Sequence, residues 1–175
     1  MEKINLYLDV SSTNTGVCIE NPSQNTIKLS NINLKKLSKP SQMPLVDFQK
    51  IKIGLMKEEL DSILKDYVVQ AVYIEGIFIQ PKFLNSSEFL LKIHGFLMGY
   101  FMDIPVYYFP PKVIKKFITG NGNASKEDVL RKLNEFYQIQ LNDDNQADAL
   151  ALCVYQNNWK TYRNKNKEGG IMNEN

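Results

Sequence analysis

The chain has little of what cross-linked or zinc-binding domains need. It contains one histidine and two cysteines, Cys18 and Cys153, which lie far apart and within apolar runs. No Cys-x-x-Cys pair is present, which excludes a disulfide framework and a Cys/His zinc site. No apolar run reaches the roughly 18 residues of a transmembrane helix, and the first ten residues lack a signal peptide's apolar segment. We therefore expect a reduced, cytoplasmic protein without membrane contact, in the host cytoplasm if a phage encodes it.

The chain also lacks a strong excess of either charge. Lys and Arg number 21 and Asp and Glu number 19, so the net charge is +2. Any site for an anion must therefore be a local patch. With 175 residues, of which 43% are hydrophobic, the chain can build one cored domain. We expect one domain over residues 1–158 and a polar, disordered tail over residues 159–175.

Hydrophobic patterning predicts alternating strands and helices after an initial meander. The expected strands cover residues 4–10, 17–20, 26–34, 68–79 and 104–109. Helices are expected over residues 46–67 (weakened near Gly54), 86–101, 110–120, from Ser125 onward and 144–156. This order predicts an α/β three-layer domain, in which helices cover both faces of a five-stranded mixed sheet.

The helix expected over residues 86–101 is apolar nearly all the way round. A helix of this kind is buried on both sides. In so small a domain, one side should meet the sheet and the other a partner chain. We therefore expect a symmetric homodimer through this helix, in which His94 has a structural or interfacial role.

Three acids occupy positions where a carboxylate is costly. Asp9 ends an apolar strand, Glu75 lies within the most apolar strand, and Asp148 is flanked by alanine and leucine in a helix. An unpaired buried carboxylate costs several kcal/mol, and these segments contain no basic residue. If the three acids converge, a divalent cation such as Mg²⁺ or Mn²⁺ fits them best. The alternative is that each is capped by backbone donors or faces solvent.

Four motifs follow one another in an order that is specific as a set. They are LDVSSTNTG with Asp9, IEGIF with Glu75 and Phe78, IKKFITGNGNASKEDV with Lys115, Gly120, Gly122 and Lys126, and QADALALCVY with Asp148. From residue 5 to about residue 156, the chain resembles the RuvC family of Holliday-junction resolvases, which have an RNase H-like fold. The SSTNTG turn is most similar to phage-borne members.

The resemblance implies a mechanism and a ligand set. Two Mg²⁺ ions, for which Mn²⁺ can substitute, would be held by Asp9, Glu75 and Asp148 and would hydrolyse a phosphodiester bond of branched DNA. The family commonly has an Asp three residues before its last acid, where this chain has Asn145. We expect Asp144, which shares a helical face with Asp148, to stand in as the fourth catalytic ligand, or a weaker second metal.

A local basic strip is the expected DNA contact. Lys112, Lys115, Lys116 and Lys126 lie within residues 110–126 without an acid among them, which suits phosphate binding. The resemblance also implies that Phe78 stacks on junction bases. The plainer interpretations are a solvated lysine face and a core phenylalanine.

Two other functions stay open at this point. One is an RNase H-like nuclease that acts on RNA or on simpler DNA structures. The other is a branched-DNA binder without activity, which the amide at Asn145 allows. An actin-like ATPase is excluded, because that class needs two such domains and a second phosphate loop.

Overall fold

The computed structural model describes residues 1–77, 84–137 and 140–168; of residues 84–86 and 159–168, only the course of the backbone is described. Strands β1 (Glu2–Asp9), β2 (Asn14–Asn21) and β3 (Thr26–Asn33) come first, followed by the 3₁₀ turn η1 (Leu34–Lys36) and helix α1 (Leu45–Leu64). Strand β4 (Tyr67–Glu75), helix α2 (Leu84–Tyr100) and strand β5 (Val106–Phe109) follow. Helices α3 (Pro111–Thr119), α4 (Lys126–Tyr137) and α5 (Asp144–Glu168) complete the described chain.

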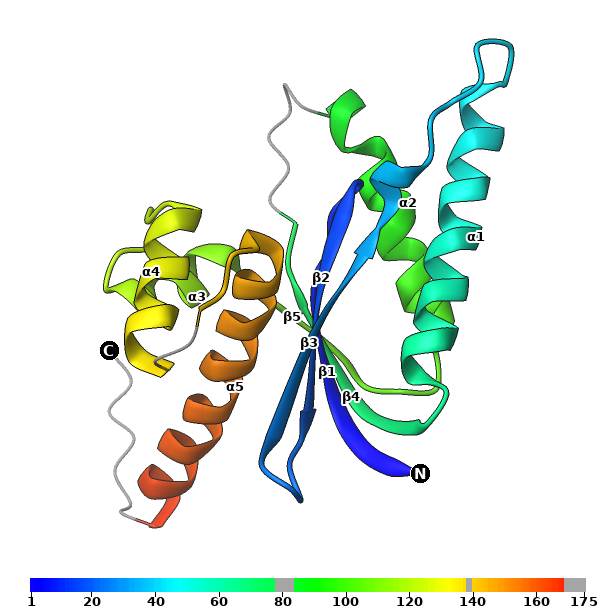
Figure 1. Ribbon diagram of the computed structural model, residues 1–175. Helices are drawn as coiled ribbons and strands as arrows, with labels where there is room; N and C mark the ends of the chain where they lie inside the picture. Colours follow the sequence, from blue (N-terminus) through cyan, green and yellow to red (C-terminus); the bar gives the residue numbers. More distant parts are fainter. Residues whose placement is uncertain (78–83, 138–139, 169–175) are drawn as a thin grey trace.

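The five strands form one mixed sheet in the order β3-β2-β1-β4-β5. The first three strands are an antiparallel meander, and β4 and β5 are added parallel to β1. Helices α1 and α2 cover one face, and α3, α4 and α5 lie over the other (Figure 1). The expected three-layer α/β architecture is therefore confirmed.

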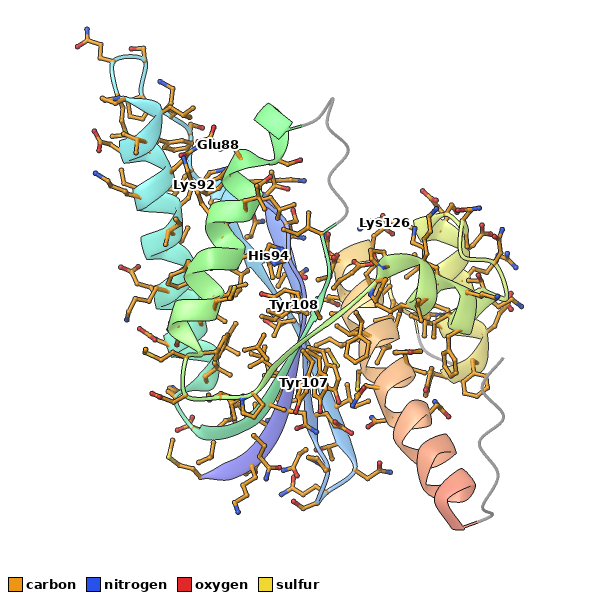
Figure 2. All side chains as sticks on the ribbon, turned by 180° about the vertical axis from the view of Figure 1, so that it is seen from behind. Glu88, Lys92, His94, Tyr107, Tyr108 and Lys126 are labelled. Atoms are coloured by element: carbon orange, nitrogen blue, oxygen red, sulfur yellow. The ribbon has the colours of Figure 1, made fainter. Side chains whose placement is uncertain are left out.

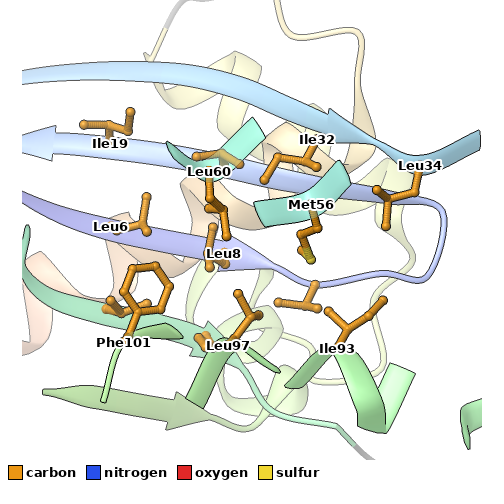
Figure 3. Packing of buried hydrophobic residues seen from close by; sticks show 14 of the residues in the cluster. Leu6, Leu8, Ile19, Ile32, Leu34, Met56, Leu60, Ile93, Leu97 and Phe101 are labelled. Atoms are coloured by element: carbon orange, nitrogen blue, oxygen red, sulfur yellow. The ribbon is translucent and has the colours of Figure 1, made fainter. Parts of the chain in front are cut away.

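The alternation of side chains along β1 builds a separate core on each face of the sheet. Ile4, Leu6 and Leu8 point toward α1 and α2, where they pack with residues such as Leu60 and Leu97 (Figure 3). The second core, toward α5, includes Tyr7, Cys18, Tyr73, Leu152 and Cys153. Because successive side chains of a strand point to opposite faces, the odd-numbered residues of β1 face α5.

A polar network anchors the middle of α5 to the sheet. The Glu20 carboxylate on β2 accepts hydrogen bonds from Tyr7 Oη at 2.6 Å and from Asn157 Nδ2 at 2.7 Å. Asn5 Nδ2 donates to the same carboxylate at 3.0 Å. Burial, followed by the nearby Cys153 and the bond to Glu20, raises the pKa of Tyr7 far above its usual range, so its hydroxyl stays a donor. These bonds fix how α5 lies across the strands.

The end of one strand differs from the sequence-based expectation at the carboxyl edge of the sheet. Strand β4 ends at Glu75 rather than at residue 79, because its partner β5 ends at Phe109, before Pro110, which has no N–H to continue the ladder. Gly76 N makes the last bond, to Phe109 O at 2.8 Å. Glu75 therefore lies at the end of its strand and not inside it.

The helices also differ in detail. Helix α1 is continuous past Gly54, because burial of Met56 and Leu60 against the sheet outweighs the cost of one glycine. Helix α5 continues to Glu168, where a polar tail was expected from residue 159. The domain boundary at residue 158 stays a prediction.

Helix α2 buries only part of its apolar surface within one chain. Ile93, Leu97 and Phe101 are buried, whereas Met98 is 60% and Met102 78% exposed. His94 is buried against the Tyr108 ring on β5 (Figure 2), and burial lowers its pKa to about 4. His94 is therefore a neutral residue that packs inside the chain, in agreement with the structural role that was one of the two expected for it. Within the described chain, every helix is too short or too polar to span a lipid bilayer.

Candidate active site

Two of the three acids lie side by side because of strand register. Leu8 pairs with Ile74 across the parallel β1–β4 ladder, so the next residues, Asp9 and Glu75, end neighbouring strands at the same edge of the sheet. Both are in phase with Tyr7 and Tyr73, which face α5. The two side chains share a hydrogen bond. The sheet therefore presents both carboxyl groups to α5.

Helix α5 supplies the third acid, and its start is held tightly against the sheet. Asp143 caps the helix, since its Oδ1 accepts bonds from the backbone N–H of Asn145 at 2.9 Å and of Gln146 at 3.0 Å. Its other oxygen accepts a bond from Asn31 Nδ2 on β3 at 2.9 Å. This cap fixes the first turn of α5 over the sheet.

Gly16 makes the close approach of α5 possible. A Cβ at this position of β2 would overlap the carbonyl of Asn145, so any side chain there would push the helix away. Gly16 is also the cross-strand partner of Asp9. The point of closest approach thus lies beside the first acid, one helical turn before Asp148.

Lys126 joins the acids. It is the first residue of α4 (Figure 2), and its Nζ lies 2.7 Å from Asp148 Oδ2 and 3.6 Å from Asp9 Oδ2. Ser125 and Asp128 form a capping box at the start of α4, with Ser125 N donating to Asp128 Oδ2 at 3.2 Å and Asp128 N to Ser125 Oγ at 3.1 Å. The cap fixes the start of α4 and with it the point from which Lys126 extends.

Burial and mutual repulsion dominate the electrostatics of the site. Burial, then the charge of Asp9 and the bond with it, raises the pKa of Glu75 to about 9. Burial also raises the pKa of Asp148, although Lys126 opposes this shift. Burial alone would lower the pKa of Lys126, but the bond to Asp148 and the charge of Asp9 outweigh it and raise that pKa. Three carboxyl groups thus share one cation, and the site favours additional positive charge.

The donor chemistry of the cluster fits a hard divalent cation. Asp9, Glu75 and Asp148 supply carboxylate oxygens, which such ions prefer, and Lys126 neutralises only part of their charge. As the side chains lie, no group of three or more His, Cys, Asp or Glu residues in the described parts of the chain is arranged to hold a metal ion. A cation bound to Asp9 and Asp148 would therefore compete with Lys126 for their oxygens.

The two candidates for a fourth ligand lie in the first turn of α5. Asp144 and Asn145 are both half-buried, and Asn145 Nδ2 lies 3.4 Å from Asp143 Oδ1. Because Asp144 and Asp148 are four residues apart in one helix, they share a face, as expected. The role of Asp144 as a ligand stays a prediction.

The basic strip divides into three kinds of lysine. Lys112 and Lys116 are exposed on α3. Lys115 Nζ donates to the carbonyl of Ala124 at 2.9 Å and so braces the loop before α4. Lys126, expected at the DNA backbone, lies on the carboxylates. Phe78 lies outside the described residues, so its proposed stacking role stays a prediction.

The contributions of Asp143, Gly16 and the Lys126 ion pair were not foreseen from the sequence. A signal for the first existed, because Asp143 directly precedes a helix with an apolar stripe, as N-cap residues do. The other two depend on contacts between segments far apart in sequence.

Comparison with known proteins decides the family. The sequence model of the family described as "Crossover junction endodeoxyribonuclease RuvC" matches residues 6–156, which include all three acids. The chain belongs to the RuvC family. A curated RuvC from Christiangramia forsetii is 30% identical over 184 residues, covering 96% of this chain and 87% of the relative. The Porphyromonas gingivalis RuvC is 25% identical over 193 residues, covering 95% and 96%.

Solved RuvC-type structures share the fold. Thermus thermophilus RuvC superimposes with a TM-score of 0.57 at 20% identity, covering 85% of this chain and 90% of that one. The yeast mitochondrial Holliday junction resolvase gives a TM-score of 0.61 at 14% identity, covering 94% and 83%. The expected RNase H-like fold is thereby confirmed, and with it the resemblance drawn from the four motifs.

The contact at Gly16 generates a test of how the site is built. Gly16→Ala should lower the free energy of unfolding by about 3 kcal/mol, because overpacking against a backbone carbonyl that cannot rotate away is costly. Chemical denaturation measures this change.

Gly54→Ala in α1 is the matched control, since open space surrounds Gly54. It should raise the free energy of unfolding by about 0.5–1 kcal/mol. A Gly16→Ala protein within about 0.5 kcal/mol of the wild type would show that α5 is not seated through this contact.

Proposed function

We propose that this RuvC-family protein is a metal-dependent, structure-selective endonuclease that resolves Holliday junctions by symmetric nicking and also cuts other branched DNA. The observation that carries the proposal is the cluster of Asp9, Glu75, Asp148 and Lys126 at the carboxyl edge of an RNase H-like sheet. One curated relative is named a crossover junction endodeoxyribonuclease, and the Thermus thermophilus RuvC has been solved in complex with a Holliday junction substrate.

Mg²⁺ is the proposed cofactor, with Mn²⁺ as a substitute, and Asp9, Glu75 and Asp148 would hold it, joined by Asp144. Bound divalent ions activate a water and stabilise the leaving oxygen of a phosphodiester in an in-line displacement. Burial, together with the charge of Asp9, raises the pKa values of Glu75 and Asp148, so that additional positive charge beside these carboxyl groups is favourable. Carboxylates in such surroundings favour a cation over protons when one is present.

Lys126 has two proposed tasks. Its side chain is 45% exposed while the carboxylates beside it are 9–10% exposed, so it forms the solvent-facing boundary of the cluster. It holds the Asp9 and Asp148 side chains near one another before substrate binds, and its bond to Asp148 opposes the rise in the pKa of that carboxyl group that burial causes. With its exposed part it would contact the phosphate to be cut, next to the phosphates held by Lys112, Lys115 and Lys116.

The proposed DNA contacts also include Phe78, which follows Glu75 by three residues in the sequence and would stack on an unpaired base at the branch point. The branched DNA and the free, buried cysteines Cys18 and Cys153 both suit the cytoplasm, which we keep as the proposed location.

A homodimer through α2 fits the need for two symmetric nicks. Leu91 is 44% and Met98 60% exposed on this helix, and Met102 follows at 78%. No atom lies within 4 Å of a Cβ built at Gly95 or Gly99, so the helix has room for a close neighbour between its apolar side chains. Leu91, Gly95 and Met98 follow one another at steps of four and three positions and therefore share one side of the helix.

Light scattering should report a dimer at micromolar concentration, and Met98→Glu should give a monomer, because a charge would be buried in the interface. Phe136→Glu is the matched control, since Phe136 is 79% exposed on α4, on the other face of the sheet, and should stay dimeric. A wild-type monomer, or two variants that behave alike, would contradict the α2 interface.

Cleavage of four substrates tests the proposed function against its alternatives. The wild type should cut a synthetic four-way junction into two symmetric nicked products with Mg²⁺ or Mn²⁺, and not with EDTA. A linear duplex of the same sequence and an RNA–DNA hybrid should remain uncut, and a replication-fork substrate should be cut more slowly.

Each alternative predicts a different pattern. Preferential cutting of the hybrid or of the linear duplex would assign the protein to the RNA- or simple-DNA-cleaving nucleases. Tight junction binding without cleavage in either metal would make it a branched-DNA binder.

A further inference from the structure

The lysines of this protein fall into two groups according to their partners. Four lysines of α1, α2 and α4 are neutralised by an acid about one turn away, in the pairs Lys50–Asp47, Lys57–Asp61, Lys92–Glu88 and Lys132–Glu135. The segment over residues 34–44, which we call the η1 segment, is different. It holds Lys35, Lys36 and Lys39 without any acid, and none of these three has a carboxylate partner among the described residues.

The η1 segment lies at the same edge of the sheet as the carboxylate cluster. Two successive antiparallel pairings make β3 run in the direction of β1, so Asn33 at the end of β3 and Asp9 at the end of β1 share an edge. Leu34 N donates to Thr13 O at 2.8 Å, which ties η1 to the turn that follows Asp9. Asn33 caps η1 by accepting a bond from Lys35 N at 2.9 Å.

Lys35 and Lys36 are the residues of this segment that are available to a ligand. Both are exposed. Lys39 already holds the loop together, because its Nζ donates to Pro40 O at 3.2 Å and Met43 O at 2.9 Å. The turn that carries these two ammonium groups is fixed at both ends, so their backbone positions are defined. A lysine binds phosphate as a point charge and needs no fixed orientation, so the pair suits an extended polyanion.

The position of Lys35 and Lys36 relative to the lysines of α3 indicates which polyanion, branched DNA, they would contact. The η1 segment follows one edge strand, β3, and α3 with Lys112 and Lys116 follows the other edge strand, β5 (Figure 1). With neighbouring strands 4.7–4.9 Å apart, the two edges are separated by about 19 Å. The carboxylates on β1 and β4 lie between them. A branched DNA that places its branch point on the carboxylates has arms leaving toward both edges.

We propose that Lys35 and Lys36 bind the phosphates of a second duplex arm of the branched substrate, while Lys112 and Lys116 hold the first. The inference rests on the proposed function and adds to it the place where selectivity for branched over linear DNA arises. A linear duplex that is engaged at α3 has no arm to offer the η1 segment. Contacts of this kind position the DNA and carry no sequence information.

The salt dependence of binding tests the proposal with the full-length protein and Ca²⁺ in place of Mg²⁺ to suppress cleavage. Each lost phosphate contact lowers the slope of log K against log salt by about 0.9. Lys35→Gln/Lys36→Gln should therefore flatten the slope for a four-way junction by about 2, so that between 50 and 200 mM salt the variant loses about tenfold less affinity than the wild type. The slope for a linear duplex should not change.

Lys3→Gln/Lys65→Gln removes the same charge from exposed lysines at the opposite end of the sheet, and it should leave both slopes unchanged. An η1 double variant that behaves like this control overturns the proposal. So does an equal loss of slope on junction and linear duplex, which would place η1 on the same arm as α3. Unchanged thermal unfolding of both variants excludes a folding defect.

Nicking of the same junction by the wild type in Mg²⁺ is measured separately. Its absence would refute the proposed nuclease activity while the two slopes still decide whether η1 binds a second arm.

Discussion

The contact of α5 with the sheet at Gly16 is the constraint on which the site depends. Two of the acids, Asp9 and Glu75, are fixed by the register of β1 and β4, but the third belongs to a helix that could pack in many ways. The missing side chain at Gly16 and the Asp143 cap bring the first turn of α5 onto the strand beside Asp9. The Glu20–Asn157 bond then sets its direction farther along. Asp148 reaches the other carboxyl groups only because both ends of this contact are satisfied.

The packing of α5 against the sheet brings carboxyl groups close together, which is electrostatically unfavourable but suits the proposed function. Three poorly solvated carboxyl groups lie together with one lysine, and the consequence is a Glu75 pKa of about 9 and a raised Asp148 pKa. Such a cluster is less stable than an apolar core would be, and the proposed function uses it to hold divalent cations at the edge of the sheet. On the same proposal, the bordering lysines that have no acidic partner among the described residues attract DNA to this edge. The same sheet edge thus concentrates negative charge at its centre and positive charge on both sides.

The succession of strands and helices along the chain, the three layers and the three acids could be predicted from the sequence, because they follow from periodicity and from acids in apolar surroundings. The end of β4 at Glu75 could not, since it depends on Pro110, which directly follows the neighbouring strand β5. Lys126 was predicted to bind DNA and lies on the carboxylates, a contact between segments whose approach no local pattern encodes. The same is true of Gly16 and of Lys115, which braces a loop. The types of residue in the sequence indicate which side chains form the site. Only the tertiary packing determines which partner each of these side chains contacts.

The most direct test of the central claim is the nicking of a four-way junction by Asp9→Asn and Asp148→Asn, with junction affinity measured on the same samples. If these carboxylates hold the catalytic cation, both variants bind the junction as tightly as the wild type but fail to nick it in Mg²⁺. Their thermal stability should be preserved, since each substitution removes a charge from a crowded cluster. A variant that nicks at the wild-type rate would show that the reaction takes place elsewhere.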